Sequence, residues 1–196
     1  MRISKKALEL ELERVPEKVG RLGVRYEQYP TPSYVAADVL WEAYVRGDIE
    51  GKMVLDLGCG TGRLAYGVEL LGGRALCVEL DETLLQESPC LEKAKAFIPY
   101  VPSRKVDTVI MNPPYGTKRK KADKPFWDIA LELSRSVYSI QPWAEGLFNV
   151  IRRNALSKGF KCEVLKVYEY HLKMLYSFHK SRRKRMEVAL YHCFKP

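Results

Sequence analysis

Residues 52–62 read Lys52-Met53-Val54-Leu55-Asp56-Leu57-Gly58-Cys59-Gly60-Thr61-Gly62, and this stretch decides the fold. The apolar run Lys52–Leu57 is typical of a strand that is buried on both faces of a parallel sheet. The glycines let the backbone approach a ligand closely, and the apolar positions that follow recur at helical spacing. A strand, a glycine-rich turn and a helix in this order open the α/β folds that bind nucleotides.

The spacing of the glycines narrows the class of ligand. Gly58, Gly60 and Gly62 follow the acidic residue Asp56 in the pattern Gly-x-Gly-x-Gly, with Thr61 between the last two. The pyrophosphate fingerprint of dinucleotide folds is Gly-x-Gly-x-x-Gly instead. The turn therefore predicts a nucleoside ligand that lacks phosphates.

A second acid stands at the end of the next predicted strand, Ala75–Glu79. It comes roughly 20 residues after the first glycine, where an acid in such folds accepts hydrogen bonds from the ribose hydroxyls. A solvated glutamate at a strand end is the alternative interpretation. Together with the glycine turn, the position favours a ribose-binding role for Glu79.

The run Val106–Met111 predicts another buried strand, and Asn112-Pro113-Pro114-Tyr115 ends it. Proline cannot continue the hydrogen-bond ladder, and it restricts the residue before it to extended geometry. We therefore expect Asn112 at the carboxyl end of a strand, where open α/β sheets bind ligands. A rigid amide beside an aromatic ring suits a flat, amino-bearing substrate. An isolated motif of this kind would be an ordinary strand exit, but the upstream turn and acid favour a site.

Other apolar patterns predict the remaining elements: helices at residues 2–15, 33–46, 125–134 and 143–157, and strands at residues 95–98, 137–140, 161–168 and 187–194. Thr31 is expected to cap the helix that starts at Ser33, with Pro32 at the first helical position. The last two strands alternate like an antiparallel edge pair. The length fits a single domain over residues 1–196, in which the N-terminal helices of residues 1–50 contribute to the site.

The charge balance points to a polyanionic partner. Lys and Arg outnumber Asp and Glu by 33 to 24, for a net charge of +9. One basic cluster follows Asn-Pro-Pro-Tyr directly, and a second precedes the last strand. We expect them to contact phosphates of a polyanion, against the alternative of solvated charge runs. Their residues are Lys118, Arg119, Lys120, Lys121, His179, Lys180, Arg182, Arg183, Lys184 and Arg185.

The cysteines and histidines suggest no metal site. Five cysteines are scattered without a Cys-x-x-Cys pair, which argues against zinc and against a secreted disulfide framework. The histidines His171, His179 and His192 form no ligand or triad pattern. The N-terminus lacks the apolar centre of a signal peptide, and no apolar run reaches ~18 residues. We therefore expect a cytoplasmic protein without a transmembrane helix.

Three longer runs of the sequence resemble one family. They are Glu27-Gln28-Tyr29-Pro30-Thr31-Pro32, then Asp56–Gly60, then Asp107–Lys118, and Tyr176–Lys180 near the C-terminus fits too. With a glycine turn, an acid and Asn-Pro-Pro-Tyr at three strand ends, the chain resembles the class I S-adenosylmethionine-dependent methyltransferases. Over nearly its whole length it resembles the small-subunit rRNA N6-adenosine methyltransferases of the methyltransferase-like-five type.

The resemblance implies a fold, a cofactor, a reaction and a partner. The fold is a Rossmann-like α/β fold, with a seven-stranded, mostly parallel sheet, helices on both faces and the last strand inserted antiparallel. The reaction is methyl transfer from S-adenosylmethionine to the N6 amino group of an adenosine in small-subunit rRNA. The partner, besides RNA, is a small zinc-binding activator protein of the Trm-one-one-two type. The expected cofactor-binding residues are Gln28, Tyr29, Thr31, Asp56, Gly58, Gly60, Thr61, Gly62, Arg63 and Glu79, and the expected catalytic residues are Asn112, Pro113, Pro114 and Tyr115.

The chain departs from the family pattern at two places. The family usually has an acid after the third strand that receives the cofactor's adenine amino group, whereas Lys95–Ser103 contains no acid. A backbone group near Phe97 is expected to take that role. Tyr115 replaces the more usual Phe, which preserves stacking on the target base. Asn112 Oδ1 and the Pro113 carbonyl are expected to accept the hydrogens of the target amino group, so that alignment replaces a general base.

Other functions stay open on the sequence alone. A DNA adenine or a protein glutamine amide is the nearest alternative target, because the glutamine enzymes share Asn-Pro-Pro-Tyr. A non-catalytic RNA-binding module for ribosome assembly would not need to bind a cofactor, so a cofactor titration distinguishes it. An NAD-dependent oxidoreductase is disfavoured by the glycine spacing.

Overall fold

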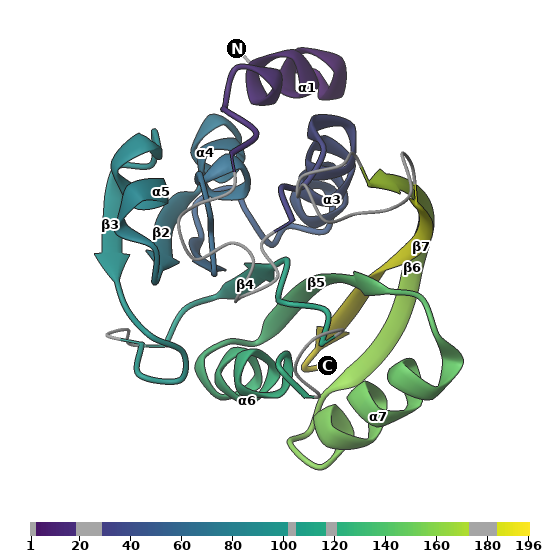
Figure 1. The fold of residues 1–196 in the computed structure, drawn as a ribbon. Coiled ribbons are helices and arrows are strands. Elements are labelled where there is room, and N and C mark those ends of the chain that lie inside the picture. Colours follow the sequence, from purple (N-terminus) through teal and green to yellow (C-terminus); the bar gives the residue numbers. More distant parts are fainter. Residues whose placement is uncertain (1–2, 19–28, 102–104, 117–120, 173–183) are drawn as a thin grey trace.

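The computed structural model describes residues 3–18, 29–101, 105–116, 121–172 and 184–196, without the side chains of residues 170–172, 184 and 185. Within these residues the chain forms one seven-stranded sheet flanked by helices (Figure 1). The helices are α1 (Lys5–Glu13), α3 (Ser33–Val45), α4 (Arg63–Leu70), α5 (Glu82–Glu87), α6 (Lys124–Leu133) and α7 (Glu145–Leu156). The strands are β1 (Met53–Leu57), β2 (Arg74–Glu79), β3 (Glu92–Lys95), β4 (Thr108–Met111), β5 (Ser136–Pro142), β6 (Lys161–Leu172) and β7 (Lys184–Phe194).

The strand order β3-β2-β1-β4-β5-β7-β6 places the switch in winding direction at β1. β1 pairs in parallel with β2 on one side and with β4 on the other. In open α/β sheets, ligands bind outside the carboxyl ends of the strands at such a switch. The carboxyl ends of β1, β2 and β4 are the three positions at which the sequence analysis expects functional residues.

The C-terminal strands follow the order that the resemblance implies. β7 lies between β5 and β6 and is antiparallel to both of them. The fold class predicted from the sequence is thereby confirmed. Both strands are longer than the sequence patterns suggested: β6 extends to Leu172, and β7 begins at Lys184.

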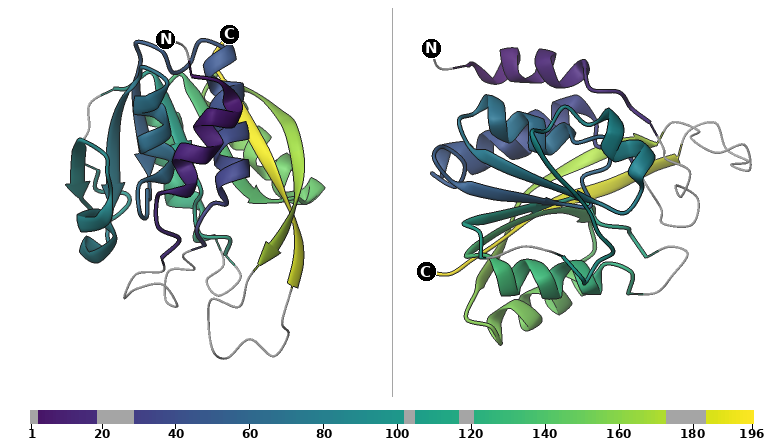
Figure 2. Two further views of the ribbon diagram at one scale, coloured as in Figure 1. Left: turned by 90° about the horizontal axis from the view of Figure 1, so that it is seen from above. Right: turned by 90° about the vertical axis from the view of Figure 1, so that its left-hand side faces the viewer.

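Helices cover both faces of the sheet (Figure 2). α3 and α4 lie on one face, with α1 outside them as an additional layer, while α6 and α7 lie on the other face. Each face has its own buried apolar cluster, one around Leu40 and Val68 and the other around Val109 and Trp127. The N-terminal region is therefore packed on the same side of the sheet as the helix after the glycine turn.

The third strand was placed wrongly from the sequence. The expectation was residues 95–98, but β3 is Glu92–Lys95, an edge strand that pairs only with β2. The more apolar run after it, Ala96–Ile98, lies beyond the strand and lines a cavity, although the Ala96 N–H still donates to the Glu79 carbonyl. Apolar character here reflects contact with the cavity and not strand pairing.

The structure also contains two disulfides that the cysteine spacing did not indicate. Cys59 is bonded to Cys77 and Cys162 to Cys193, whereas Cys90 is a buried free thiol. Both pairs come together through the sheet: Cys162 and Cys193 are register partners of β6 and β7, and Cys77 lies in β2 beside the glycine turn. Linear spacing reveals only local cysteine pairs, so these long-range pairs were missed.

The described residues contain no helix long and apolar enough to cross a membrane. They also contain no group of three or more His, Cys, Asp or Glu side chains arranged to hold a metal ion.

Packing around Gly62 gives a test of the fold. Its φ is +79°, and a Cβ there would lie 1.9 Å from the Ser88 hydroxyl oxygen. Gly62→Ala is expected to lower the free energy of unfolding by about 2–4 kcal/mol, from backbone strain and overpacking together. Urea denaturation of the cofactor-free protein measures this loss.

Gly47→Ala is the matched control. Gly47 has nearly the same φ, +81°, but nothing lies within 4 Å of its Cβ position. Gly47→Ala is expected to lower the free energy of unfolding through backbone strain alone, by about 1–2 kcal/mol. Equal losses in the two variants would contradict the close contact between the glycine turn and Ser88.

Candidate active site

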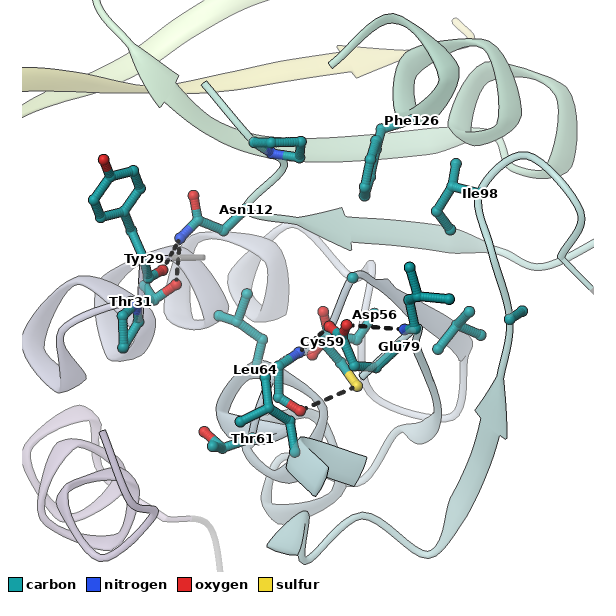
Figure 3. A pocket seen from close by; sticks show the side chains of 18 of the residues that line it. Tyr29, Thr31, Asp56, Cys59, Thr61, Leu64, Glu79, Ile98, Asn112 and Phe126 are labelled. Atoms are coloured by element: carbon teal, nitrogen blue, oxygen red, sulfur yellow. Dashed lines mark hydrogen bonds between the residues drawn. The ribbon is translucent and has the colours of Figure 1, made fainter. Parts of the chain in front are cut away.

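A cavity of about 620 Å³ lies at the carboxyl ends of β1, β2 and β4. Figure 3 shows side chains from these strand ends and from the segment before α3 meeting around it. It joins most of the residues that the sequence predicted for the cofactor and the target. The described lining residues from those two sets are Tyr29, Thr31, Asp56, Gly58, Gly60, Thr61, Arg63, Glu79, Asn112 and Pro114.

Glu79 is buried at the end of β2 and binds the glycine turn. Its Oε2 accepts from the Gly60 N–H at 2.9 Å, and its Oε1 accepts from the N–H groups of Leu80 and Asp81. Burial raises the pKa of this carboxyl, against the lowering effect of the three backbone donors. A carboxylate has about four acceptor positions, so capacity is left for a ligand hydroxyl.

Asp56 is the more deeply buried acid, with 1% of its surface exposed. Its Oδ2 accepts from the Ala65 N–H at 2.9 Å, while Oδ1 is buried without a partner in the described part of the chain. Burial raises the pKa of Asp56 to about 7, and the neighbouring charge of Glu79 adds to the rise. An acceptor left without a partner beside a cavity is suited to a hydrogen-bonding ligand.

The Asn112 side chain makes two hydrogen bonds through its amide nitrogen. Its Nδ2 donates to the Tyr29 carbonyl and to Thr31 Oγ1, both at 3.0 Å. Its Oδ1 is buried and has no partner among the described residues. In Figure 3 the amide nitrogen points toward Tyr29 and Thr31 and the oxygen points away from them. The free polar atom of Asn112 is therefore an acceptor.

Thr31 does not cap α3 as expected. The residue at the cap position is Pro32, and no side chain bonds to the first turn of the helix. The Thr31 hydroxyl is instead turned toward Asn112, which competes with capping for the same oxygen. The local sequence showed a good cap but could not show the distant amide.

Two expected cofactor residues hold the N-terminal segment. Arg63 donates to the carbonyls of Thr31 (2.6 Å) and Val15 (2.5 Å), and Thr61 Oγ1 donates to the Pro16 carbonyl (3.0 Å). Both side chains line the cavity, yet their hydrogen bonds fix the chain around it. Gly62 is absent from the described lining residues, since it faces Ser88 instead.

The tyrosine of the Asn-Pro-Pro-Tyr motif stacks within the protein. The rings of Tyr115 and Tyr29 lie 5.5 Å apart with 18° between their planes. The Tyr115 hydroxyl is buried, and burial raises its pKa. Neither Pro113 nor Tyr115 is among the described lining residues of the cavity. Stacking of a target base on Tyr115 stays a prediction.

Several expected residues fall outside the described part of the chain. These are Gln28, Lys118, Arg119, Lys120, His179, Lys180, Arg182 and Arg183, together with the side chains of Lys184 and Arg185. Of the basic residues predicted to contact RNA, Lys121 has a described side chain, which is exposed at the cavity.

Sequence reasoning missed part of the cavity lining. Lys18 contributes a cation, and Phe126 at the start of α6 approaches Gly58 so closely that a Cβ there would lie 2.9 Å from its ring. Ile98 and Pro99 line the wall beyond β3. Phe126 directly follows Pro125, the proline at the start of the predicted helix. That position was the sequence signal that could have identified Phe126 as a lining residue.

The residues present fit a nucleoside cofactor with positively charged groups. Glu79 provides acceptor capacity for a ribose hydroxyl, and Asp56 provides an unpartnered acceptor that gains by ionising beside a cation. Nothing lies within 4 Å of the Cβ position of Gly60, so the backbone there is open to a close ligand. Phe97 lines the cavity just beyond β3, and the role of its backbone in binding adenine stays a prediction.

Comparison with known proteins identifies the family. The rRNA N(6)-adenosine-methyltransferase Mettl5 of Drosophila melanogaster is 35% identical over 179 residues, which cover 83% of each chain. The chain belongs to the METTL5 family of rRNA N6-adenosine methyltransferases. No protein-family model matches the chain.

Solved structures agree with this family assignment. A candidate RNA methyltransferase from Pyrococcus horikoshii superposes with a TM-score of 0.87 at 35% identity, over 100% of this chain and 99% of that one. The Mtq2–Trm112 complex of E. cuniculi has a chain at 19% identity and a TM-score of 0.62, covering 86% of this chain and 98% of that chain. The second likeness is one of fold.

The buried Asp56 gives a pH prediction. Its pKa is near 7 in the folded protein and near 4 in the unfolded chain, so the folded state holds the extra proton between these values. The free energy of unfolding should therefore fall as pH rises from 4 to 7, by up to about 4 kcal/mol from this group. The Asn side chain in Asp56→Asn cannot ionise, so the free energy of unfolding of this variant should fall correspondingly less between pH 4 and 7.

Urea denaturation of both proteins at several pH values between 4 and 8 measures the difference. Parallel curves for Asp56→Asn and the unaltered protein would contradict a protonated, buried Asp56.

Proposed function

We propose that this protein transfers a methyl group from S-adenosylmethionine to the N6 amino group of an adenosine in small-subunit rRNA. Membership of the METTL5 family supports the reaction. The observation that carries the proposal is the buried, unpartnered Oδ1 of Asn112 at a cavity that also contains Glu79 and Asp56. An acceptor at that position is suited to a donor from the target, and an amino group is such a donor.

The cofactor would be held by the strand ends and the glycine turn. Glu79 would accept from a ribose hydroxyl, and the open backbone at Gly60 would lie close to the ligand. Asp56 would offer its free oxygen to a positively charged group. Ile98 and Phe97 form the apolar wall beside which the adenine would lie. S-adenosylmethionine supplies an activated methyl group whose sulfur leaves with the bonding electron pair.

The protein's contribution to the reaction is alignment. The exocyclic nitrogen of adenine is a poor nucleophile, because its lone pair is delocalised into the ring. Asn112 Oδ1 accepts one amino hydrogen, and the Pro113 carbonyl accepts the other, so that the nitrogen becomes pyramidal. The proton leaves after the methyl group has been transferred, so no general base with a shifted pKa is needed.

The target base must leave its stack to reach the cavity. Lys121 lines the cavity and carries positive charge suited to the neighbouring phosphates, whereas Lys18, which also lines it, is paired with Glu87. The basic residues 118–120 and 179–185 are proposed to extend this contact along the RNA. The net charge of +9 favours nucleic acid over a glutamine side chain as the target.

Asn112→Ala tests the proposed reaction. The protein and labelled S-adenosylmethionine are incubated with small-subunit rRNA, with DNA and a protein-glutamine substrate in parallel, and the digested products are identified. N6-methyladenosine should form in the rRNA, and Asn112→Ala should lower kcat by at least about 100-fold. Calorimetry should find cofactor affinity within about threefold of the unaltered protein, because Asn112 contacts the target.

Each other result has a definite meaning. Normal turnover by Asn112→Ala would reject the mechanism, and label only in DNA or glutamine would reject the substrate. Cofactor binding without transfer to any substrate would indicate that an activator is required. Absence of cofactor binding would favour the ribosome-assembly module.

We also propose that a small zinc-binding activator of the Trm112 type docks along β3. β3 is an outer strand of the sheet, and an exposed strand edge can add a strand from a partner. Three large apolar side chains near it are exposed, Leu91 by 84%, Tyr100 by 77% and Phe97 by 46%. Apolar patches that adjoin an open strand edge are typical of protein interfaces.

The double variant Leu91→Asp, Tyr100→Asp should weaken binding of a purified Trm112-type protein by more than about tenfold. Calorimetry measures the affinity. Leu156→Asp is the matched control, since Leu156 is 67% exposed but lies on α7. Loss of binding in the control, or unchanged binding in the double variant, would place the partner elsewhere.

A further inference from the structure

We propose that Thr31, together with the backbone of Tyr29, is a positioning residue that fixes which atom of the Asn112 amide faces the target. The resemblance places Thr31 with the cofactor, whereas its hydrogen bond in the structure is to Asn112. The inference rests on the proposed function, in which Asn112 Oδ1 accepts from the target amino group.

The orientation of the amide follows from the chemistry of its neighbours. A backbone carbonyl can only accept, so the Asn112 atom 3.0 Å from the Tyr29 carbonyl must be the NH₂ nitrogen. Thr31 Oγ1 lies 3.0 Å from the same nitrogen and accepts its second hydrogen. Both amide hydrogens are then used, and Oδ1 is the remaining polar atom of the side chain.

The opposite orientation is unfavourable. It would place Oδ1 against the Tyr29 carbonyl oxygen, two acceptors at hydrogen-bond distance, and turn the NH₂ group into the buried position where Oδ1 lies. That amide would donate to the target instead of accepting from it. A group that donates cannot accept a hydrogen from the adenine amino group, so the flip would remove the proposed catalytic contact.

Thr31 is itself held in place. The Arg63 guanidinium donates to its carbonyl at 2.6 Å and to the Val15 carbonyl at 2.5 Å. On the other side, α3 begins directly after Pro32, whose ring fixes the local backbone. The Thr31 hydroxyl is thus presented to Asn112 from a segment anchored at α4 and at α3.

The Thr31 hydroxyl also carries a hydrogen of its own, which a ligand in the cavity could accept. A positioning role and a cofactor-binding role therefore predict different kinetics. Loss of positioning lowers kcat and leaves cofactor affinity unchanged, whereas loss of a cofactor contact raises the dissociation constant of the cofactor.

The test compares Thr31→Val, which has nearly the same shape without an acceptor, with Thr31→Ser, which keeps the acceptor. Thr31→Val should lower kcat by about 10- to 100-fold. The dissociation constants of S-adenosylmethionine and of the rRNA substrate should stay within about twofold. Thr31→Ser should restore kcat to within about threefold of the unaltered protein.

A spectroscopic signature reports the hydrogen bond directly, even in a protein with no activity. The chain has three asparagines, Asn112, Asn149 and Asn154, so selective ¹⁵N-asparagine labelling gives three side-chain amide pairs. The Asn112 pair should exchange slowly with water, and Asn149, which is exposed on α7, provides a rapidly exchanging reference. Thr31→Val should speed exchange of one Asn112 hydrogen, and Thr31→Ser should not.

The outcomes separate this inference from the proposed function. Unchanged kcat and exchange in Thr31→Val, with Asn112→Ala inactive, would overturn the positioning role and leave the function intact. If Thr31→Val raised the dissociation constant of the cofactor by the same factor as it lowered kcat, the positioning role would also be overturned. Full activity in Asn112→Ala would overturn the function itself. If Thr31→Val is unfolded by circular dichroism, Thr31→Ala is used with the same criteria.

Discussion

The carbonyl oxygen of Tyr29 can accept a hydrogen bond but cannot donate one, and this restriction orients the amide of Asn112. The remaining amide atom, Oδ1, is then a buried acceptor with no partner among the described residues. An unpartnered buried acceptor is costly in a protein that binds nothing at that position. The arrangement becomes favourable when an amino group supplies the missing donor, which is why the site suits a target with such a group.

The two halves of the site are built in different ways. The half proposed to hold the cofactor is made by β1, β2 and the turn between β1 and α4, with Glu79 bonding to the turn. The target half depends on contacts between the segment before α3 and the end of β4. Its parts lie far apart in the sequence, at residues 29–31 and at Asn112, and the fold brings them together. Changes at Glu79 and at Asn112 are therefore expected to affect binding and turnover separately.

The sequence predicted the fold, and it predicted that the residues at the strand ends meet at one cavity, because both follow from local patterns. The strand, turn and acid occupy neighbouring positions, and so do Asn112 and the prolines that fix its backbone. The role of Thr31 could not be predicted, because its partner lies 81 residues away and the local pattern favoured a helix cap. The disulfides were missed and β3 was misplaced for the same reason. Strand pairing, and not spacing along the chain, determines which residues meet.

The anchoring of Thr31 by Arg63 has a consequence for the order of folding. During synthesis the segment around Thr31 appears before the two residues that bond to it, since Arg63 and Asn112 follow it in the chain. Contacts between residues so far apart form late, because closing a long loop must be offset by many interactions at once. The glycine turn and its acid need far less of the chain. During synthesis, a cofactor-binding surface can therefore assemble before the protein has an amide oriented for transfer.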